Sequence, residues 1–171
     1  MKKQNKKHES GRSMFEMVGV LAVMGLITAA AFVLITSAMR SQKLSRADDD
    51  IAALAAGVRL LYNNSADNGG YKGITTATSA GTLKALGFEN VKPAYGTDSN
   101  YTIAPATKTV SNNVVTWADC ATNATTCNGF SIKFNTDSEN TCKGLAQRTW
   151  ANGGKSECTG AALKIYFDDG K

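Results

Sequence analysis

The sequence predicts an α+β fold, in which one long N-terminal helix precedes a head built on an antiparallel sheet. Apolar residues of the N-terminal third follow helical spacing without a break. Near the C-terminus, apolar residues alternate with polar ones, as in strands that bury one face of a sheet. The four cysteines lie in the same C-terminal third and predict disulfides within the head.

The first half of the predicted helix is apolar enough to cross a membrane. Met17 to Ala38 is a run of 22 residues without a charge. At 1.5 Å per residue it spans roughly 33 Å, the thickness of a bilayer core. The run is longer than the apolar core of a secretory signal peptide and continues directly into further helix, so we expect it to be retained. Four lysines precede it and favour a cytoplasmic N-terminus.

The second half of the helix is predicted to be amphipathic. Its apolar residues recur at spacings of three and four and should dock on the head. The helix is expected from Met14 to Asn63, where a run rich in Asn and Gly begins. Asp48–Asp50 lies mainly off the apolar face and is interpreted as solvated helix surface. The apolar face consists of Leu44, Ala47, Ile51, Leu54, Ala55, Val58 and Leu61.

The head is expected to combine short strands with two helical segments. A helical turn is predicted at Leu83–Gly87, and a helix after Asn140 that extends through Trp150. Trp117 and Trp150 are both interpreted as core residues. Strands are predicted at Tyr101–Ala104, Val114–Trp117, Gly129–Phe134 and Leu163–Phe167.

The cysteine spacing favours disulfides over a zinc site. Structural zinc sites group their ligands in close pairs, whereas these cysteines are separated by six, fourteen and fifteen residues with no histidine nearby. Four cysteines allow three connectivities, and the spacing alone does not choose among them. The cysteines are Cys120, Cys127, Cys142 and Cys158.

Catalytic and nucleic-acid functions find no support in the sequence. The only histidine, His8, precedes the apolar run, and no nucleotide-binding or nucleophile motif is present. The net charge of +5 falls to +2 without residues 1–11, because 15 basic residues then face 13 acidic ones. No basic stripe with interleaved aromatics occurs. We therefore expect no enzyme activity, no cofactor, no metal and no nucleic-acid partner.

Glu16 is the one charge at the start of the apolar helix. A carboxylate in such a place is costly and points to a function with a specific partner. It is the fifth residue after Gly11, which closes a short basic segment. This arrangement resembles the class III signal sequence of type IV prepilins. The resemblance implies that prepilin peptidase cuts between Gly11 and Arg12 and methylates the new amine of Arg12. It also implies that Glu16 pairs with the N-terminal amine of a neighbouring subunit during assembly.

The end of the chain resembles the type IVb pilins, which include the PilS-like and toxin-coregulated groups. A strand, a helix carrying Cys142-Lys143-Gly144-Leu145, and Cys158-Thr159-Gly160 before a last strand carry this resemblance. It implies a Cys142–Cys158 disulfide, with Cys120–Cys127 forming a small local loop. The implied partners are further copies of the chain in a helical fibre, the peptidase, the assembly machinery of the bacterial inner membrane, and membrane lipid before assembly.

The resemblance also implies a location and a division of the chain. The subunit would wait in the inner membrane with its head in the periplasm and then join a surface fibre that serves adhesion, aggregation or conjugation. A minor pilin or a type II secretion pseudopilin is an alternative within the same superfamily. A membrane-anchored periplasmic binding protein that never polymerises is an alternative from another class. The expected parts are a leader (residues 1–11), an apolar helix (12–39), an amphipathic helix (40–63) and the head (64–171).

Overall fold

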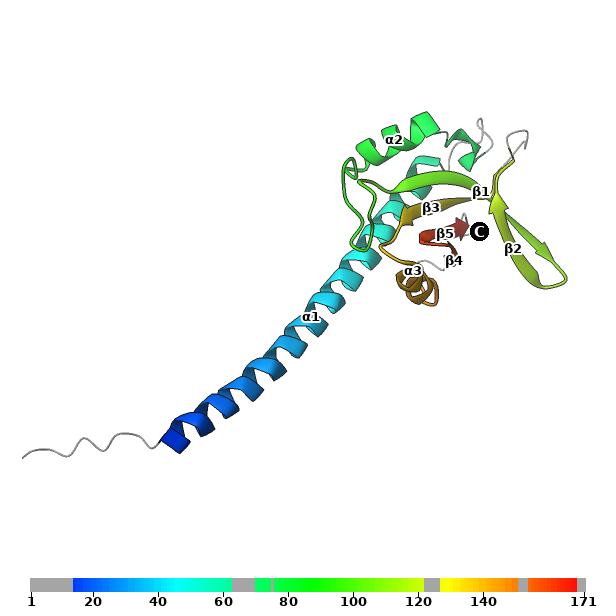
Figure 1. Ribbon diagram of the computed structural model, residues 1–171. Coiled ribbons are helices and arrows are strands. Elements are labelled where there is room, and N and C mark those ends of the chain that lie inside the picture. Colours follow the sequence, from blue (N-terminus) through cyan, green and yellow to red (C-terminus); the bar gives the residue numbers. More distant parts are fainter. Residues whose placement is uncertain (1–13, 63–69, 75, 122–126, 151–153, 169–171) are drawn as a thin grey trace, which may run out of the picture. The chain divides into compact units, whose positions relative to one another are not determined.

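The computed structural model describes residues 14–62, 70–74, 76–121, 127–150 and 154–168 (Figure 1). The chain divides into two compact units, Met1–Gln42 and Lys43–Lys171. One helix, α1 (Met14–Tyr62), belongs to both. The predicted start of this helix is confirmed, and Asn63, its expected last residue, lies outside the described part of the chain.

The second unit places one face of α1 in the core of the head. Ala47, Ile51, Leu54, Ala55 and Val58 are buried, at the spacing of three and four that the sequence shows. Leu44 packs against this core while remaining partly exposed. The predicted amphipathic segment is therefore an integral part of the head.

A five-stranded antiparallel sheet forms the rest of the head, with strand order β2-β1-β3-β5-β4. The two central pairings, β1 with β3 and β3 with β5, join strands that are distant along the chain, whereas β1–β2 and β4–β5 are hairpins. The strands are β1 (Thr102–Ser111), β2 (Val114–Asp119), β3 (Gly129–Asn135), β4 (Lys155–Thr159) and β5 (Ala162–Asp168).

Alternation along β3 and β5 gives the sheet one apolar face. Phe130 lies opposite Phe167, Ile132 opposite Ile165, and Phe134 opposite Leu163, and all six side chains are buried. Since residues opposite one another share a face of the sheet, these pairs form one continuous apolar surface. They belong to the same buried cluster as the inward face of α1.

Three short helical segments complete the head: η2 (Tyr71–Gly73), α2 (Thr76–Ala85) and α3 (Glu139–Ala146). The turn predicted at Leu83–Gly87 is the end of the longer helix α2, after which Gly87 adopts a positive φ of 77°. Helix α3 ends before the predicted limit, and Trp150 follows it as a buried core residue.

The predicted strands are present, but the sheet is larger than predicted. β1 runs seven residues beyond Ala104, and the strand β4 was not predicted. Its sequence, Lys-Ser-Glu-Cys-Thr, carries one cysteine among polar residues and lacks an apolar alternation. Only its pairing with β5 identifies it as a strand.

Candidate functional site

The first half of α1 exposes apolar side chains on all its sides. Its large apolar residues from Met14 to Met39 are between 51% (Val20) and 90% (Phe15) exposed. A helix that is apolar all round needs a membrane or other protein around it. α1 contains a segment long and apolar enough to cross a bilayer, a criterion of length and composition that signal sequences also meet. The helix is therefore suited to anchoring in a membrane or to packing within other protein.

Glu16 is the only charged residue in this apolar half, and it lies in the first turn of α1. The backbone N–H groups there have no partner within the helix, so a carboxylate in the first turn is favourable for helix formation. The side chain is exposed, like its apolar neighbours. A charged group of another molecule can therefore reach it. Gly11 and Arg12, the residues of the predicted cleavage site, lie outside the described residues.

Two threonines in the apolar half satisfy their hydroxyl groups within the helix. Thr28 Oγ1 donates to the Met24 carbonyl at 2.7 Å, and Thr36 Oγ1 donates to the Val33 carbonyl at 2.9 Å. A buried hydroxyl without such a bond costs free energy in a hydrocarbon environment. These bonds make both residues compatible with lipid or with a packed helix bundle.

Charged residues in the second half of α1 join it to the head. Asp48 pairs with Arg148 after α3 at 3.1 Å, and Asp50 accepts a hydrogen bond from the Tyr101 hydroxyl at 3.2 Å. Burial of Tyr101, and then the negative charge of Asp50, raise the pKa of the tyrosine. The interpretation of Asp48–Asp50 as solvated surface is correct only for Asp49, because the other two are partly buried and bonded.

A second charged contact joins α1 to the last strand. Arg59 Nε donates to the Asp168 carbonyl at 3.1 Å, and its guanidinium carbon lies 5.8 Å from the centre of the Phe167 ring. The Asp168 carboxylate also pairs with Lys108 of β1 at 2.8 Å. α1, β1 and β5 are thus joined at one point. Sequence reasoning missed this cluster, because Arg59, Lys108 and Asp168 are each more than forty residues apart along the chain.

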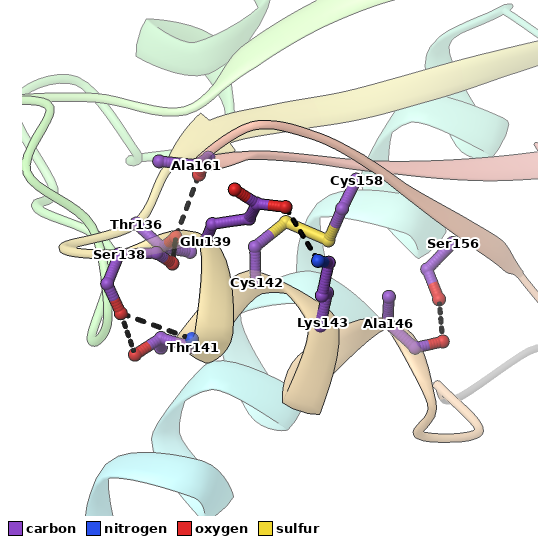
Figure 2. The surroundings of a disulfide bond; sticks show 10 residues. All are labelled: Thr136, Ser138, Glu139, Thr141, Cys142, Lys143, Ala146, Ser156, Cys158 and Ala161. Atoms are coloured by element: carbon purple, nitrogen blue, oxygen red, sulfur yellow. Dashed lines mark hydrogen bonds and ion pairs between the residues drawn. A yellow bond between two sulfur atoms is a disulfide. The ribbon is translucent and has the colours of Figure 1, made fainter.

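Two disulfides join the cysteines that the family resemblance had paired. Figure 2 shows Cys142 of α3 bonded to Cys158 of β4. Nearby, Ser138 accepts a hydrogen bond from the Thr141 N–H, and Ser156 of β4 donates to the Ala146 carbonyl at 2.7 Å. The bridge and the second of these hydrogen bonds both hold α3 against the edge of the sheet.

The other disulfide, Cys120–Cys127, connects the end of β2 to the segment before β3. Cys127 is buried, and its carbonyl accepts the Tyr71 N–H at 3.3 Å. The bridge therefore also holds the segment around Tyr71, which follows α1 in the chain. Disulfides are typical of proteins outside the cytoplasm, so the two bridges indicate an extracytoplasmic head.

The outer face of the sheet carries an aromatic pair that the sequence did not indicate. Trp117 of β2 stacks on Tyr166 of β5, with ring centres 5.6 Å apart. Lys164 beside this pair bonds to Asp119. Trp117 is half-buried on this outer face, so its assignment to the core is wrong, whereas that of Trp150 is confirmed. Among the described residues, no group of three or more His, Cys, Asp or Glu is arranged to hold a metal ion.

Comparisons with known proteins found no match to a family model, to a curated protein or to a solved structure. Classification therefore depends on the architecture alone. A 49-residue helix with an apolar N-terminal half leads into a five-stranded antiparallel sheet, and two disulfides stabilise the head. This architecture is pilin-like, and it is consistent with a pilin-like subunit that is anchored in a membrane or secreted.

Proposed function

We propose that this chain is the prepilin of a type IV pilus of the type IVb class and polymerises through α1 into a surface fibre. The observation that carries the proposal is the contrast within this one helix. Ala47–Val58 supplies a face of the head's own core, whereas every residue of Met14–Met39 is exposed in the described part of the chain. A fibre of packed helices would cover the apolar half, and the membrane would cover it before assembly.

Processing prepares the end of this helix for assembly. Prepilin peptidase cuts after Gly11, and the amine of Arg12 becomes methylated. Glu16 of one subunit pairs with this amine on a neighbour and so fixes the position of adjacent helices along the fibre. The pair is favourable because each charge, alone among apolar side chains, would pay a large desolvation cost. The inner-membrane assembly machinery and further copies of the chain are the partners.

Mass spectrometry of the surface protein tests the processing step. We expect an N-terminal peptide that begins at Arg12 and carries one methyl group. A mature protein that still begins at Met1 would contradict the proposal. Abundance of the chain in sheared fibres then separates a major pilin from a minor pilin or a secretion pseudopilin, both of which are scarce there.

Substitution of Glu16 tests the assembly step. Glu16→Ala should insert, fold and be processed normally, while fibre yield falls about tenfold or more, since a contact worth ~1.4 kcal/mol changes an equilibrium tenfold. The matched control is Asp49→Ala, which removes another exposed acid of α1 that forms no ion pair with any other described residue. Fibre mass is measured after shearing, beside the amount of mature protein in membranes. Fibres of normal yield and length from Glu16→Ala would favour the non-polymerising anchored protein.

A further inference from the structure

The edge of the sheet that β2 forms is open (Figure 1). β1 covers one side of β2, and no strand of the described chain pairs with its other side. The hairpin turn between β1 and β2 is tight, because Asn112 and Asn113 both have positive φ angles, of 49° and 62°. Figure 1 shows this hairpin extending away from the remainder of the sheet.

The pairing register shows which backbone groups point outward along this edge. Cys120 N–H donates to the Pro105 carbonyl at 3.2 Å, one position beyond the pair Ala106–Asp119. Bonded and non-bonded pairs alternate in an antiparallel ladder, so every second residue of β2 is bonded to β1. The residues between them direct their N–H and C=O groups away from β1. These residues are Val115, Trp117 and Asp119.

In the neighbouring strand β1, backbone groups that point away from β2 are bonded by a side chain. Lys108 of β1 points its backbone groups toward β3, just beyond the position where β3 begins at Gly129, and the Asn128 side chain bonds to both groups. The Lys108 N–H donates to Asn128 Oδ1 at 2.7 Å, and Asn128 Nδ2 donates to the Lys108 carbonyl at 2.9 Å. No such side chain covers the outward groups of β2 among the described residues. The edge of β2 is therefore available to another strand.

The side chains along β2 do not prevent such pairing. Exposed edges are commonly protected by charges, and β4, at the other edge of the sheet, carries Lys155 and Glu157. β2 has one charge, Asp119 at its end, which bonds to Lys164. Its hairpin instead exposes valines: Val110 is 61%, Val114 60% and Val115 41% exposed.

The sequence of β2 is complementary to itself when two copies run antiparallel. With Thr116 opposite Thr116 of the second copy, Val115 lies opposite Trp117 and Val114 opposite Ala118. Threonine pairs and pairs of an aromatic with a β-branched residue are favourable across strands. The outward groups of Val115 and Trp117 then bond to one another, and Asp119 faces Asn113 rather than a second acid. A parallel arrangement would instead place Asp119 beside Asp119.

We propose that β2 is a docking edge for β2 of a second copy of this chain, with Thr116 on the two-fold axis. A two-fold contact closes after two copies, so it cannot be the repeating contact of a helical fibre. If the proposed function holds, this contact joins heads of neighbouring fibres. One strand pair is a small interface, and the many heads displayed along a fibre strengthen it through multivalency.

Cysteine cross-linking tests the pairing in the full-length protein. Thr116 pairs with itself at a non-hydrogen-bonded position, where Cα atoms lie about 4.5 Å apart, within the range of a disulfide. Detergent-solubilised Thr116→Cys should form a disulfide-linked dimer on mild oxidation, at least about fivefold more than Thr109→Cys. Thr109 is the matched control, since it is exposed on the same hairpin opposite Thr116 but lies in β1. Peptide mapping should find the introduced cysteines of two copies bonded to one another and both native disulfides intact.

A charge at the edge provides the second measurement. Val115→Lys in the Thr116→Cys background should reduce dimer formation to the level of Thr109→Cys, because a lysine on an edge strand opposes pairing. Thr109→Lys in the same background adds the same charge to the other strand and should leave cross-linking unchanged. Equal cross-linking of Thr116→Cys and Thr109→Cys, or no effect of Val115→Lys, would overturn the proposal.

The cross-linking assay requires no fibre, so its failure is distinct from failure of the proposed function. Dimers of Thr116→Cys from a chain that is never cleaved after Gly11 would contradict the pilin assignment and leave the docking edge intact. Processed fibres whose Thr116→Cys subunits do not cross-link would contradict only the docking edge.

Discussion

Gly129 shows how one residue limits both the pairing of two strands and the packing on the outer face of the sheet. A Cβ atom there would lie 2.5 Å from the Phe167 carbonyl oxygen and 2.8 Å from Cζ3 of Trp117. The first contact is with backbone of the neighbouring strand and cannot be relieved by a side-chain rotation. The second is with the ring that covers the outer face. Glycine at this position thus lets β3 and β5 pair while Trp117 reaches Tyr166.

Gly129→Ala should therefore destabilise the head, by about 1–3 kcal/mol, as overpacking does elsewhere. Gly144→Ala is the matched control, since Gly144 lies within α3 and nothing surrounds its Cβ position within 4 Å. That change should stabilise the protein by about 0.5–1 kcal/mol through the higher helix propensity of alanine. Urea unfolding of the two detergent-solubilised variants gives both values. A stabilised Gly129→Ala protein would show that the sheet relaxes easily around the added methyl group.

At the scale of elements, α3 is a short helix that depends on its ends and its disulfide. Eight residues are too few for a stable isolated helix. Ser138 caps its N-terminus by accepting the Thr141 N–H at 3.2 Å. Lys143 pairs with Glu139 one turn earlier, which lowers the pKa of this exposed carboxylate. The Cys142–Cys158 bridge, whose surroundings Figure 2 shows, then attaches the helix to β4.

Loss of the cap should cost measurable stability. Ser138→Ala is expected to lower the free energy of unfolding by about 1 kcal/mol, because the Thr141 N–H loses its acceptor. Ser138→Asp keeps an acceptor at the same position and should retain most of the stability. Thermal unfolding followed by circular dichroism, with both disulfides intact, provides the comparison. Equal losses in the two variants would mean that the cap contributes nothing here.

At the scale of the whole molecule, one helix has two different surroundings. Leu54 is fully buried in the head, whereas Leu26, in the other half of the same helix, is 73% exposed. The two residues have the same side chain and the same secondary structure. If each is replaced by alanine, any difference between the effects of the two substitutions therefore reports on what surrounds each half of α1.

Leu54→Ala should lower the stability of the head by about 2–5 kcal/mol, the usual cost of a cavity in a core. Leu26→Ala should leave unfolding of the head in detergent unchanged. On the proposed function, the same Leu26→Ala protein forms fewer fibres, because the lost methyl groups would pack between subunits. Unfolding in detergent and fibre yield are measured for both variants. A Leu26→Ala protein with an unstable head would show that the apolar half also supports the head.

The periodicity of apolar residues predicted much of this fold, because apolar residues that recur with the helix or strand period lie on one face of the element, and that face is buried. The spacing of Ile51, Leu54 and Val58 identified the inward face of α1, and alternation identified β3 and β5. β4 could not be found in this way, since its stability comes from pairing with β5 rather than from an apolar face of its own. Arg59, Lys108 and Asp168 likewise carry no local pattern that would join them.

The sequence by itself determined the apolar length of α1, the place of Glu16 at its start and the face of α1 that enters the core of the head. These are local properties, since hydrophobicity and helical spacing are read along the chain. Tertiary structure decided the strand order, the contacts of Asp48 and Asp50, and which edge of the sheet stays open. Strand pairing and ion pairs join distant residues, so their partners are set by how the chain folds back and not by the residues beside them.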